Sequence, residues 1–198
     1  MSADLTLSVV MPVYNERRTL PHILRLVMLA LPGTRKQIII VDDNSTDGSR
    51  DWLRQAFPNL SGLIVGIGQN GDGEPIFVQA KDIASATGRQ DVETLSALAA
   101  DTTVSVIFHD KNTGKGGALR TGLSAASGDA IIIQDADLEY DPADWTEMFR
   151  LVANGVAVVY GSRFYGRPHR SLYFHHYAGN RAISLLFDIL YDQIPTDV

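Results

Sequence analysis

The fold is decided by the stretch IIIVDDNSTDG at residues 38–48, in which four β-branched apolar residues are followed directly by seven polar or turn-forming ones. An unbroken apolar run of this length is typical of a strand buried on both faces, as in parallel sheets. The acids, Asn and Gly that follow favour a turn. Because ligands bind beyond the carboxyl ends of parallel strands, the stretch predicts an α/β protein with a polar site at one edge of its sheet.

Other apolar runs followed by polar residues lie before and after this stretch. Strands that alternate with helices imply right-handed crossovers and a mostly parallel central sheet with helices on both faces. The predicted strands are residues 7–11, 38–41, 104–108, 130–134 and 156–160, and the predicted helices are residues 19–31, 52–57, 116–126, 141–154 and 183–191.

The composition of the 198 residues excludes several classes of protein. With 45% hydrophobic and 20% charged residues, the chain can bury a core, unlike a disordered or fibrous protein. The absence of cysteine excludes a disulfide scaffold, a cysteine zinc site and a thiol nucleophile. A net charge of −6 argues against a nucleic-acid partner. No apolar run reaches the roughly 18 residues of a membrane span, so we expect a soluble, cytoplasmic chain.

One segment, residues 61–101, interrupts the alternation of strands and helices. We expect a single domain over residues 1–198 with this segment as an insertion, a semi-ordered flap or an oligomer contact. Within it we expect a flexible loop at 66–71, whose G-x-G-x-x-G pattern opens no helix, a short strand at 75–78 and a helix over 92–100. Because loop-closure entropy grows slowly with length, we expect the sheet to tolerate replacement of the insertion by a short turn.

Two carboxylates follow the predicted strand 130–134. Asp135 and Asp137 can converge on one hard cation, and Glu139 offers a third oxygen. Mg²⁺ or Mn²⁺ suits such a site, because these ions take few protein carboxylates and complete their shell with water and substrate phosphates. The alternative, that acids merely favour a helix start, accounts for Asp141 but not for the earlier pair.

Two further loops carry polar groups suited to a nucleotide. One of Asp42 and Asp43 can accept a hydrogen bond from the N–H of a nucleobase, although the residues after them could form only a turn and a cap. The glycine-rich turn at 112–117 opens a helix, so its backbone N–H groups and Lys115 can face an anion. The alternative is a helix entry with a solvated lysine.

Taken together, five motifs resemble those of family-two glycosyltransferases with the GT-A fold, especially the bacterial branch similar to dolichol-phosphate mannosyltransferase. They are MPVYNE at 11–16, VDDNSTDG at 41–48, NTGKG at 112–116, DADLE at 135–139 and GSRF at 161–164. The resemblance implies nucleoside contacts from Pro12, Tyr14, Glu16 and Asp43, and metal ligands from Asp135, Asp137 and Glu139. Besides Lys115 of the glycine-rich turn, other donor contacts are expected from Asp135 and Ala136. The expected catalytic groups are Asp137, Arg163 and Arg181, and the two arginines would face the acceptor phosphate or the transferred sugar.

The activity that the resemblance implies is an inverting, metal-dependent transfer of a hexose. The donor would be a nucleotide sugar of the GDP-mannose or UDP-glucose type, and the acceptor a polyprenyl phosphate such as a dolichyl or undecaprenyl phosphate. The lipid phosphate is already anionic, so positioning by arginine can replace a general base. The alternatives are transfer to a glycan or protein hydroxyl, and a non-catalytic nucleotide-sugar-binding module.

The resemblance also predicts partners and a location. A lipid acceptor implies peripheral contact with the cytoplasmic face of the membrane, and the segment 61–101 could support a homo-oligomer. Relatives continue beyond the position of Val198 with another strand and helices, so we expect the chain to be truncated there.

Overall fold

The structure is a computed structural model that describes residues 5–79, 92–94 and 102–161. The chain divides into two compact units, Met1–Gly155 and Val156–Val198. The account below concerns the first unit, apart from the short described part of the second, residues 156–161.

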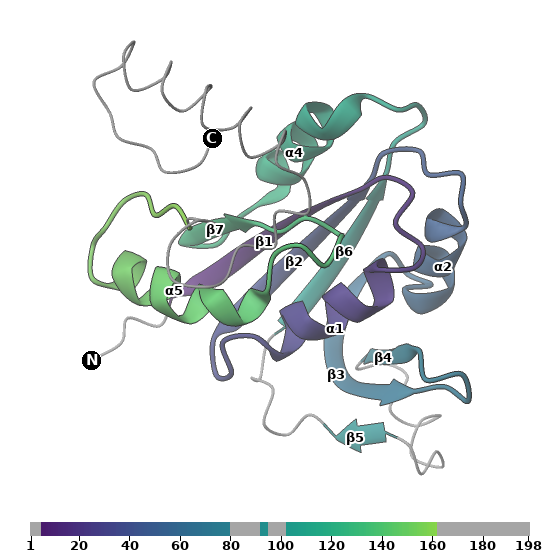
Figure 1. The fold of residues 1–198 in the computed structure, drawn as a ribbon, viewed down its shortest axis with the longest axis horizontal. Coiled ribbons are helices and arrows are strands. Elements are labelled where there is room, and N and C mark those ends of the chain that lie inside the picture. The colour runs from purple at the N-terminus through teal and green to yellow at the C-terminus, as the bar shows by residue number, and fades with distance from the viewer. Residues whose placement is uncertain (1–4, 80–91, 95–101, 162–198) are drawn as a thin grey trace, which may run out of the picture. The chain divides into compact units, whose positions relative to one another are not determined.

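A single sheet forms the centre of the first unit (Figure 1). Its strands lie in the order β4-β3-β6-β2-β1-β7, and β5 also pairs with β3. The strands β6, β2, β1 and β7 are parallel, whereas β3 runs antiparallel to β6, β4 and β5. The predicted α/β class with a mostly parallel central sheet is therefore confirmed. The strand bounds are β1 Thr6–Val13, β2 Arg35–Asp42, β3 Ser61–Gln69, β4 Pro75–Gln79, β5 Val92–Thr94, β6 Thr102–Phe108 and β7 Ala130–Ile133.

Helices cover both faces of the parallel strands. Successive side chains of a strand point to opposite faces, so β1 and β2 each supply two apolar rows. One row packs on α1, and the other packs on α4 around Ala118. The described helices are α1 Leu20–Leu29, α2 Ser49–Ala56, α4 Gly114–Ala125, the 3₁₀ turn η2 Pro142–Asp144 and α5 Trp145–Ala153.

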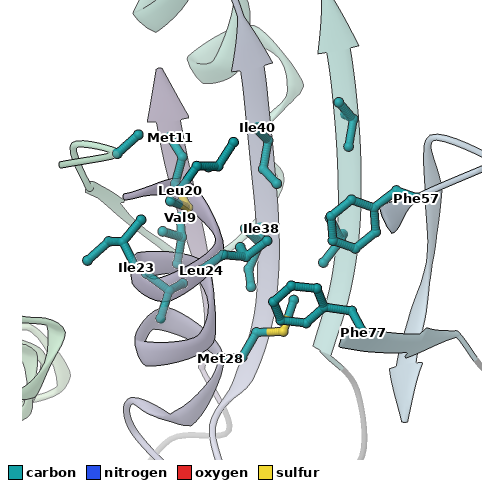
Figure 2. Packing of buried hydrophobic residues seen from close by; sticks show 14 of the residues in the cluster. Val9, Met11, Leu20, Ile23, Leu24, Met28, Ile38, Ile40, Phe57 and Phe77 are labelled. Atoms are coloured by element: carbon teal, nitrogen blue, oxygen red, sulfur yellow. The ribbon is translucent and has the colours of Figure 1, made fainter. Parts of the chain in front are cut away.

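The larger apolar cluster joins α1 to the sheet (Figure 2). Val9, Met11, Ile38 and Ile40 are fully buried beneath the apolar side chains of α1. On the other face, α4 approaches β1 closely at Gly122, where an added Cβ would lie 2.4 Å from Cγ1 of Val10. These contacts fix where α4 begins, and with it the position of the glycine-rich turn.

The described part of the segment 61–101 extends the sheet instead of forming the expected semi-ordered flap. β3 and β4 extend the sheet, and Ile64, Ile67 and Phe77 are buried in the larger cluster. The ring of Phe77 stacks on Phe57 at 5.7 Å and meets the edge of Trp52 at 6.2 Å. Removing the segment would expose this aromatic group, because α2 packs against the sheet through it.

One predicted loop and one predicted helix also differ from the structure. The predicted loop at 66–71 belongs largely to β3, because glycines interrupt the apolar alternation without breaking the backbone pairing. Residues 92–94 form β5 instead of a helix, and residues 95–100 lie outside the described residues. The short strand at 75–78 is confirmed as β4.

Residues 156–160, predicted as a strand, form no strand in the described structure. Val158 and Tyr160 are 63% and 90% exposed. An apolar run becomes a strand only where a partner strand completes its backbone hydrogen bonds, and none pairs with this run among the described residues. The predicted helix at 183–191 lies outside the described residues.

Candidate functional site

The order in which successive strands are added to the sheet reverses next to β1. It proceeds from β1 to β2 on one side, while β7 lies on the other side of β1. In sheets of this type, ligands bind in the crevice beyond the carboxyl ends of the strands at such a switch point. The loops after β1 and β7 flank that point, and the loops after β2 and β6 lie beside them.

The loop after β1 is joined to the loop after β2 by hydrogen bonds. The Asn15 backbone N–H donates to Ser45 Oγ at 3.0 Å, and the Thr46 N–H donates to Asn15 Oδ1 at 2.8 Å. Asn15 and Asn44 adopt positive φ angles of 58° and 63°, which asparagine tolerates better than most residues. The two loops therefore form one connected surface.

The residues predicted to contact a nucleoside from this side lie on that surface. Tyr14 is 50% exposed, whereas Pro12 is half-buried within β1. The N–H of Glu16 donates to Ser49 Oγ at 2.9 Å, and its carboxylate accepts the hydroxyl of Thr19 at 2.6 Å. Tyr14 thus presents an aromatic ring to solvent directly after β1.

Asp42 is a buried carboxylate with a structural partner. Its Oδ2 lies 2.7 Å from Nε of Arg50, and its Oδ1 has no hydrogen-bond partner in the described part of the chain. Arg50 also donates to the carbonyl of His109 and lies over the ring of Phe108 at 5.1 Å. Asp42 therefore links α2, through Arg50, to the residue that follows β6.

Asp43 is also buried, but protein donors engage both of its oxygens. It accepts the backbone N–H groups of Thr113 and Gly114 at 2.9 and 2.7 Å, the hydroxyl of Thr113 at 2.9 Å and Nδ1 of His109 at 2.7 Å. Burial acts to raise the pKa of Asp43, but these hydrogen bonds outweigh it and hold the pKa below its ordinary value. Asp43 thus anchors the turn that opens α4.

His109 is a site residue that sequence reasoning did not assign. Because a carboxylate can only accept, His109 donates to Asp43 from Nδ1, and its Nε2 lies 2.9 Å from Oγ1 of Thr121 on α4. Its position directly after the strand 104–108 is the signal that could have identified it. His109 links β2, β6 and α4 through one side chain.

The loop after β7 is more exposed. Asp135 is 20% exposed at its side chain, and both of its oxygens lie 2.8 Å from Nζ of Lys115. The Oδ1 of Asp137 accepts the backbone N–H of Glu139 at 3.0 Å. Buried Gln134 supports the loop by donating to the carbonyls of Asp135 and Tyr140. Ala136, between the two acids, is buried.

The expected set of three metal ligands is not gathered into one cluster. Among the described residues, no three acidic or histidine side chains come together as a metal site. Asp135 and Asp137 nonetheless supply the hard oxygens that Mg²⁺ and Mn²⁺ prefer. The Lys115 ammonium stands against both oxygens of Asp135, where a cation would be attracted. The two carboxylates after β7 therefore have the chemistry to hold a divalent ion, and the role of Glu139 as a third ligand stays a prediction.

Arg163 and Arg181 lie outside the described residues. Within the described ranges, no helix is long and apolar enough to cross a bilayer.

Comparison with known families gives a match over most of the chain. The model of the family described as Glycosyl transferase family 2 matches residues 8–73 and 88–197. The match confirms the resemblance found in the motifs and, with the α/β sheet, the expected GT-A fold. Only residues 74–87 of the predicted insertion are left unmatched.

Curated relatives are identical to the chain at somewhat more than a quarter of the aligned positions. A dolichol-phosphate mannosyltransferase of Pyrococcus furiosus is 26% identical over 160 residues, covering 81% of this chain and 34% of the relative. An undecaprenyl-phosphate 4-deoxy-4-formamido-L-arabinose transferase of Pseudomonas syringae is 28% identical over 154 residues, covering 77% and 34%. The chain thus spans about a third of the length of these relatives.

The solved structures that match part of the chain include two complexes. The mannosyltransferase PcManGT of Pyrobaculum calidifontis, in complex with GDP-Man and Mn²⁺, has a TM-score of 0.42 at 22% identity, covering 67% of this chain and 28% of that one. TarS 1–349 of S. aureus, in complex with UDP-GlcNAc, has a TM-score of 0.48 at 16% identity, covering 81% and 38%.

Proposed function

The chain belongs to glycosyl transferase family 2, and we propose that it forms the donor-binding part of an inverting, metal-dependent glycosyltransferase. The donor is a nucleotide sugar of the GDP-mannose or UDP-glucose type, and the acceptor is a polyprenyl phosphate. The names of the curated relatives, which include dolichol-phosphate and undecaprenyl-phosphate transferases, support this choice of acceptor.

One observation carries the proposal: side-chain contacts join all four loops at the carboxyl edge of the parallel strands. Asn15 connects the loops after β1 and β2, Asp43 connects those after β2 and β6, and Lys115 connects those after β6 and β7. A linked set of polar loops at a switch point supports a preorganised site for a charged ligand. A nucleotide diphosphate has the length and the charge to contact all four loops.

The donor is held in two parts in this proposal. Pro12, Tyr14, Glu16 and Asp43 hold the nucleoside, and Asp43 does so together with the turn that it anchors through Thr113 and Gly114. Lys115 and the loop containing Ala136 face the diphosphate. The amino end of α4 carries partial positive charge, which favours an anion.

A divalent ion, Mg²⁺ or Mn²⁺, is held by Asp135 and Asp137 in this proposal, with Glu139 as a further candidate oxygen ligand. When bound, the ion neutralises charge that develops on the departing diphosphate. Asp137 acts as a catalytic residue by holding that ion. The proximity of Lys115 to Asp135 supports a site in which these carboxylates attract a positive charge.

The acceptor side of the proposal rests on Arg163 and Arg181, which orient the anionic lipid phosphate for attack opposite the leaving group. Such attack inverts the anomeric centre and needs no covalent intermediate. A lipid acceptor places the protein peripherally on the cytoplasmic face of the membrane. A homo-oligomer remains part of the proposal.

Calorimetric titration with GDP-mannose and UDP-glucose, each with and without Mn²⁺, tests the donor part. We expect one nucleotide sugar to bind, and to bind more tightly with Mn²⁺. Asp51→Asn, which changes an exposed acid on α2, is a matched control that should bind like the wild type. Absence of binding by both donors under both conditions would contradict the proposed function.

A further inference from the structure

Lys115 occupies a position that helix electrostatics disfavours. It is the second residue of α4, whose first turn reads GKGG and contains no acid. The amino end of a helix carries partial positive charge, so a cation there is unfavourable. The charge of Lys115 must therefore be balanced from outside the helix, and Asp135, twenty residues further along the chain, is the group that balances it.

The contact between the two residues is close but lies near solvent. Nζ of Lys115 is 2.8 Å from both oxygens of Asp135, while the lysine side chain is 61% exposed. Exposed ion pairs contribute only about 0–1 kcal/mol. The pair is therefore strong enough to set the position of the ammonium and weak enough to be exchanged.

The same oxygens of Asp135 are those that the proposed function assigns to a divalent ion. A carboxylate whose two oxygens face an ammonium cannot present them to a metal at the same time. Two carboxylates, Asp135 and Asp137, attract a divalent ion more strongly than Asp135 attracts one exposed ammonium. Metal binding must then release Lys115, which remains at the start of α4, beside the N–H groups that favour an anion.

We propose that Lys115 is the internal counter-ion of Asp135, which a divalent ion displaces, and that the released ammonium then binds the diphosphate of the donor. The inference rests on the proposed function for its second half. It assigns Lys115 two opposite effects, since the lysine opposes binding of the metal alone and favours binding of the nucleotide once the metal is present. Metal and nucleotide then promote each other's binding, as thermodynamic linkage requires.

Lys115→Met separates these effects, because Met keeps the length of the side chain and removes its charge. Binding of Mn²⁺ alone, followed by electron paramagnetic resonance of the free ion, should become tighter by up to about fivefold, the ratio equivalent to an exposed ion pair. Binding of GDP or UDP at saturating Mn²⁺ should become weaker by about tenfold or more, as for a lost hydrogen bond to a charged group.

Two variants serve as controls. Lys111→Met removes an exposed lysine from the same loop and should change neither affinity. Lys115→Arg keeps the charge and should bind Mn²⁺ alone as weakly as the wild type does. Circular dichroism of each variant checks that α4 is folded.

The outcomes distinguish this inference from the proposed function. If the wild type binds GDP or UDP with Mn²⁺, but Lys115→Met leaves the Mn²⁺ affinity unchanged or lowers it, the counter-ion role is wrong and the proposed function stands. If neither nucleotide binds, while Lys115→Met still tightens Mn²⁺ binding, the counter-ion role stands and the proposed function is wrong. Absence of Mn²⁺ binding to both the wild type and Lys115→Met overturns the inference.

Discussion

Two pairs of aspartates lie at the same edge of the sheet, and their surroundings differ. Asp42 and Asp43, at the end of β2, are 0% and 2% exposed and are held by protein groups. Asp135 and Asp137, after β7, are partly exposed, and the first of them is balanced by a lysine that is itself largely in solvent. The same residue type after the same kind of strand thus has two different environments.

The difference teaches which acids build the site and which remain available to a ligand. A buried carboxylate must be paired or hydrogen-bonded, so its donors become part of the folded structure. A partly exposed carboxylate can exchange its partner at little cost. We therefore expect changes after β2 to act mainly on stability, and changes after β7 to act mainly on binding.

The largest expected effect comes from breaking the buried ion pair with Asp42→Ala. The unfolding free energy should fall by about 3 kcal/mol, at the low end of the range for such pairs, because Arg50 keeps the carbonyl of His109 as an acceptor. Chemical denaturation of variant and wild type measures the change. Asp51→Ala, at an exposed pair with Arg54, is the control, and an equal loss there would erase the contrast between buried and exposed acids.

Asp43→Asn should have the next largest effect. The amide nitrogen cannot accept the hydrogen bonds that now reach the carboxylate, so we expect a loss of about 2 kcal/mol in unfolding free energy. Binding of GDP or UDP should weaken as well, with or without Mn²⁺, because the turn before α4 loses its anchor.

The contribution of the Asp43 carboxylate to the unfolding free energy should decrease as the pH falls. Its folded pKa is below the ordinary value of 3.8, so its contribution to stability is complete above that value and is lost as the pH falls through the folded pKa. The difference in unfolding free energy between wild type and Asp43→Asn should be constant above about pH 5 and shrink at more acidic pH. A difference that grows on acidification would show that the carboxylate is not stabilised by these donors.

Asp137→Ala tests the other side of the comparison. We expect unfolding free energy to change by less than about 0.5 kcal/mol, while the Mn²⁺-dependent part of nucleotide affinity falls by about tenfold or more. Denaturation and calorimetric titration of the same sample measure both. Unchanged affinity and unchanged Mn²⁺ dependence would remove Asp137 from the proposed metal site.

The smallest expected effect is that of salt on the pair after β7. Asp135→Asn should alter unfolding free energy by less than about 1 kcal/mol at low ionic strength. The difference should vanish at about 1 M NaCl, where the Debye length is about 3 Å. The loss caused by Asp42→Ala should persist at that concentration, because its ion pair is shielded from solvent. A salt-insensitive contribution from Asp135 would place it with the buried acids.

The sequence by itself determined the parallel part of the sheet and the identity of its polar loops. Apolar runs such as residues 38–41, together with the acids and glycines after them, are local signals, because burial on both faces and turn formation each depend on a few neighbouring residues. The same signals did not reveal β3, where glycines interrupt the alternation, or the burial of Phe77.

Only the tertiary structure decided what each acid does. The donors that hold Asp43 lie at Thr113 and Gly114, 70 and 71 residues away in the chain. Their approach depends on the pairing of β2 with β6 and on the packing of α4 over β1 and β2. Burial and hydrogen-bond partners arise from such long-range contacts, so two similar acidic pairs in the sequence became one structural anchor and one exchangeable site.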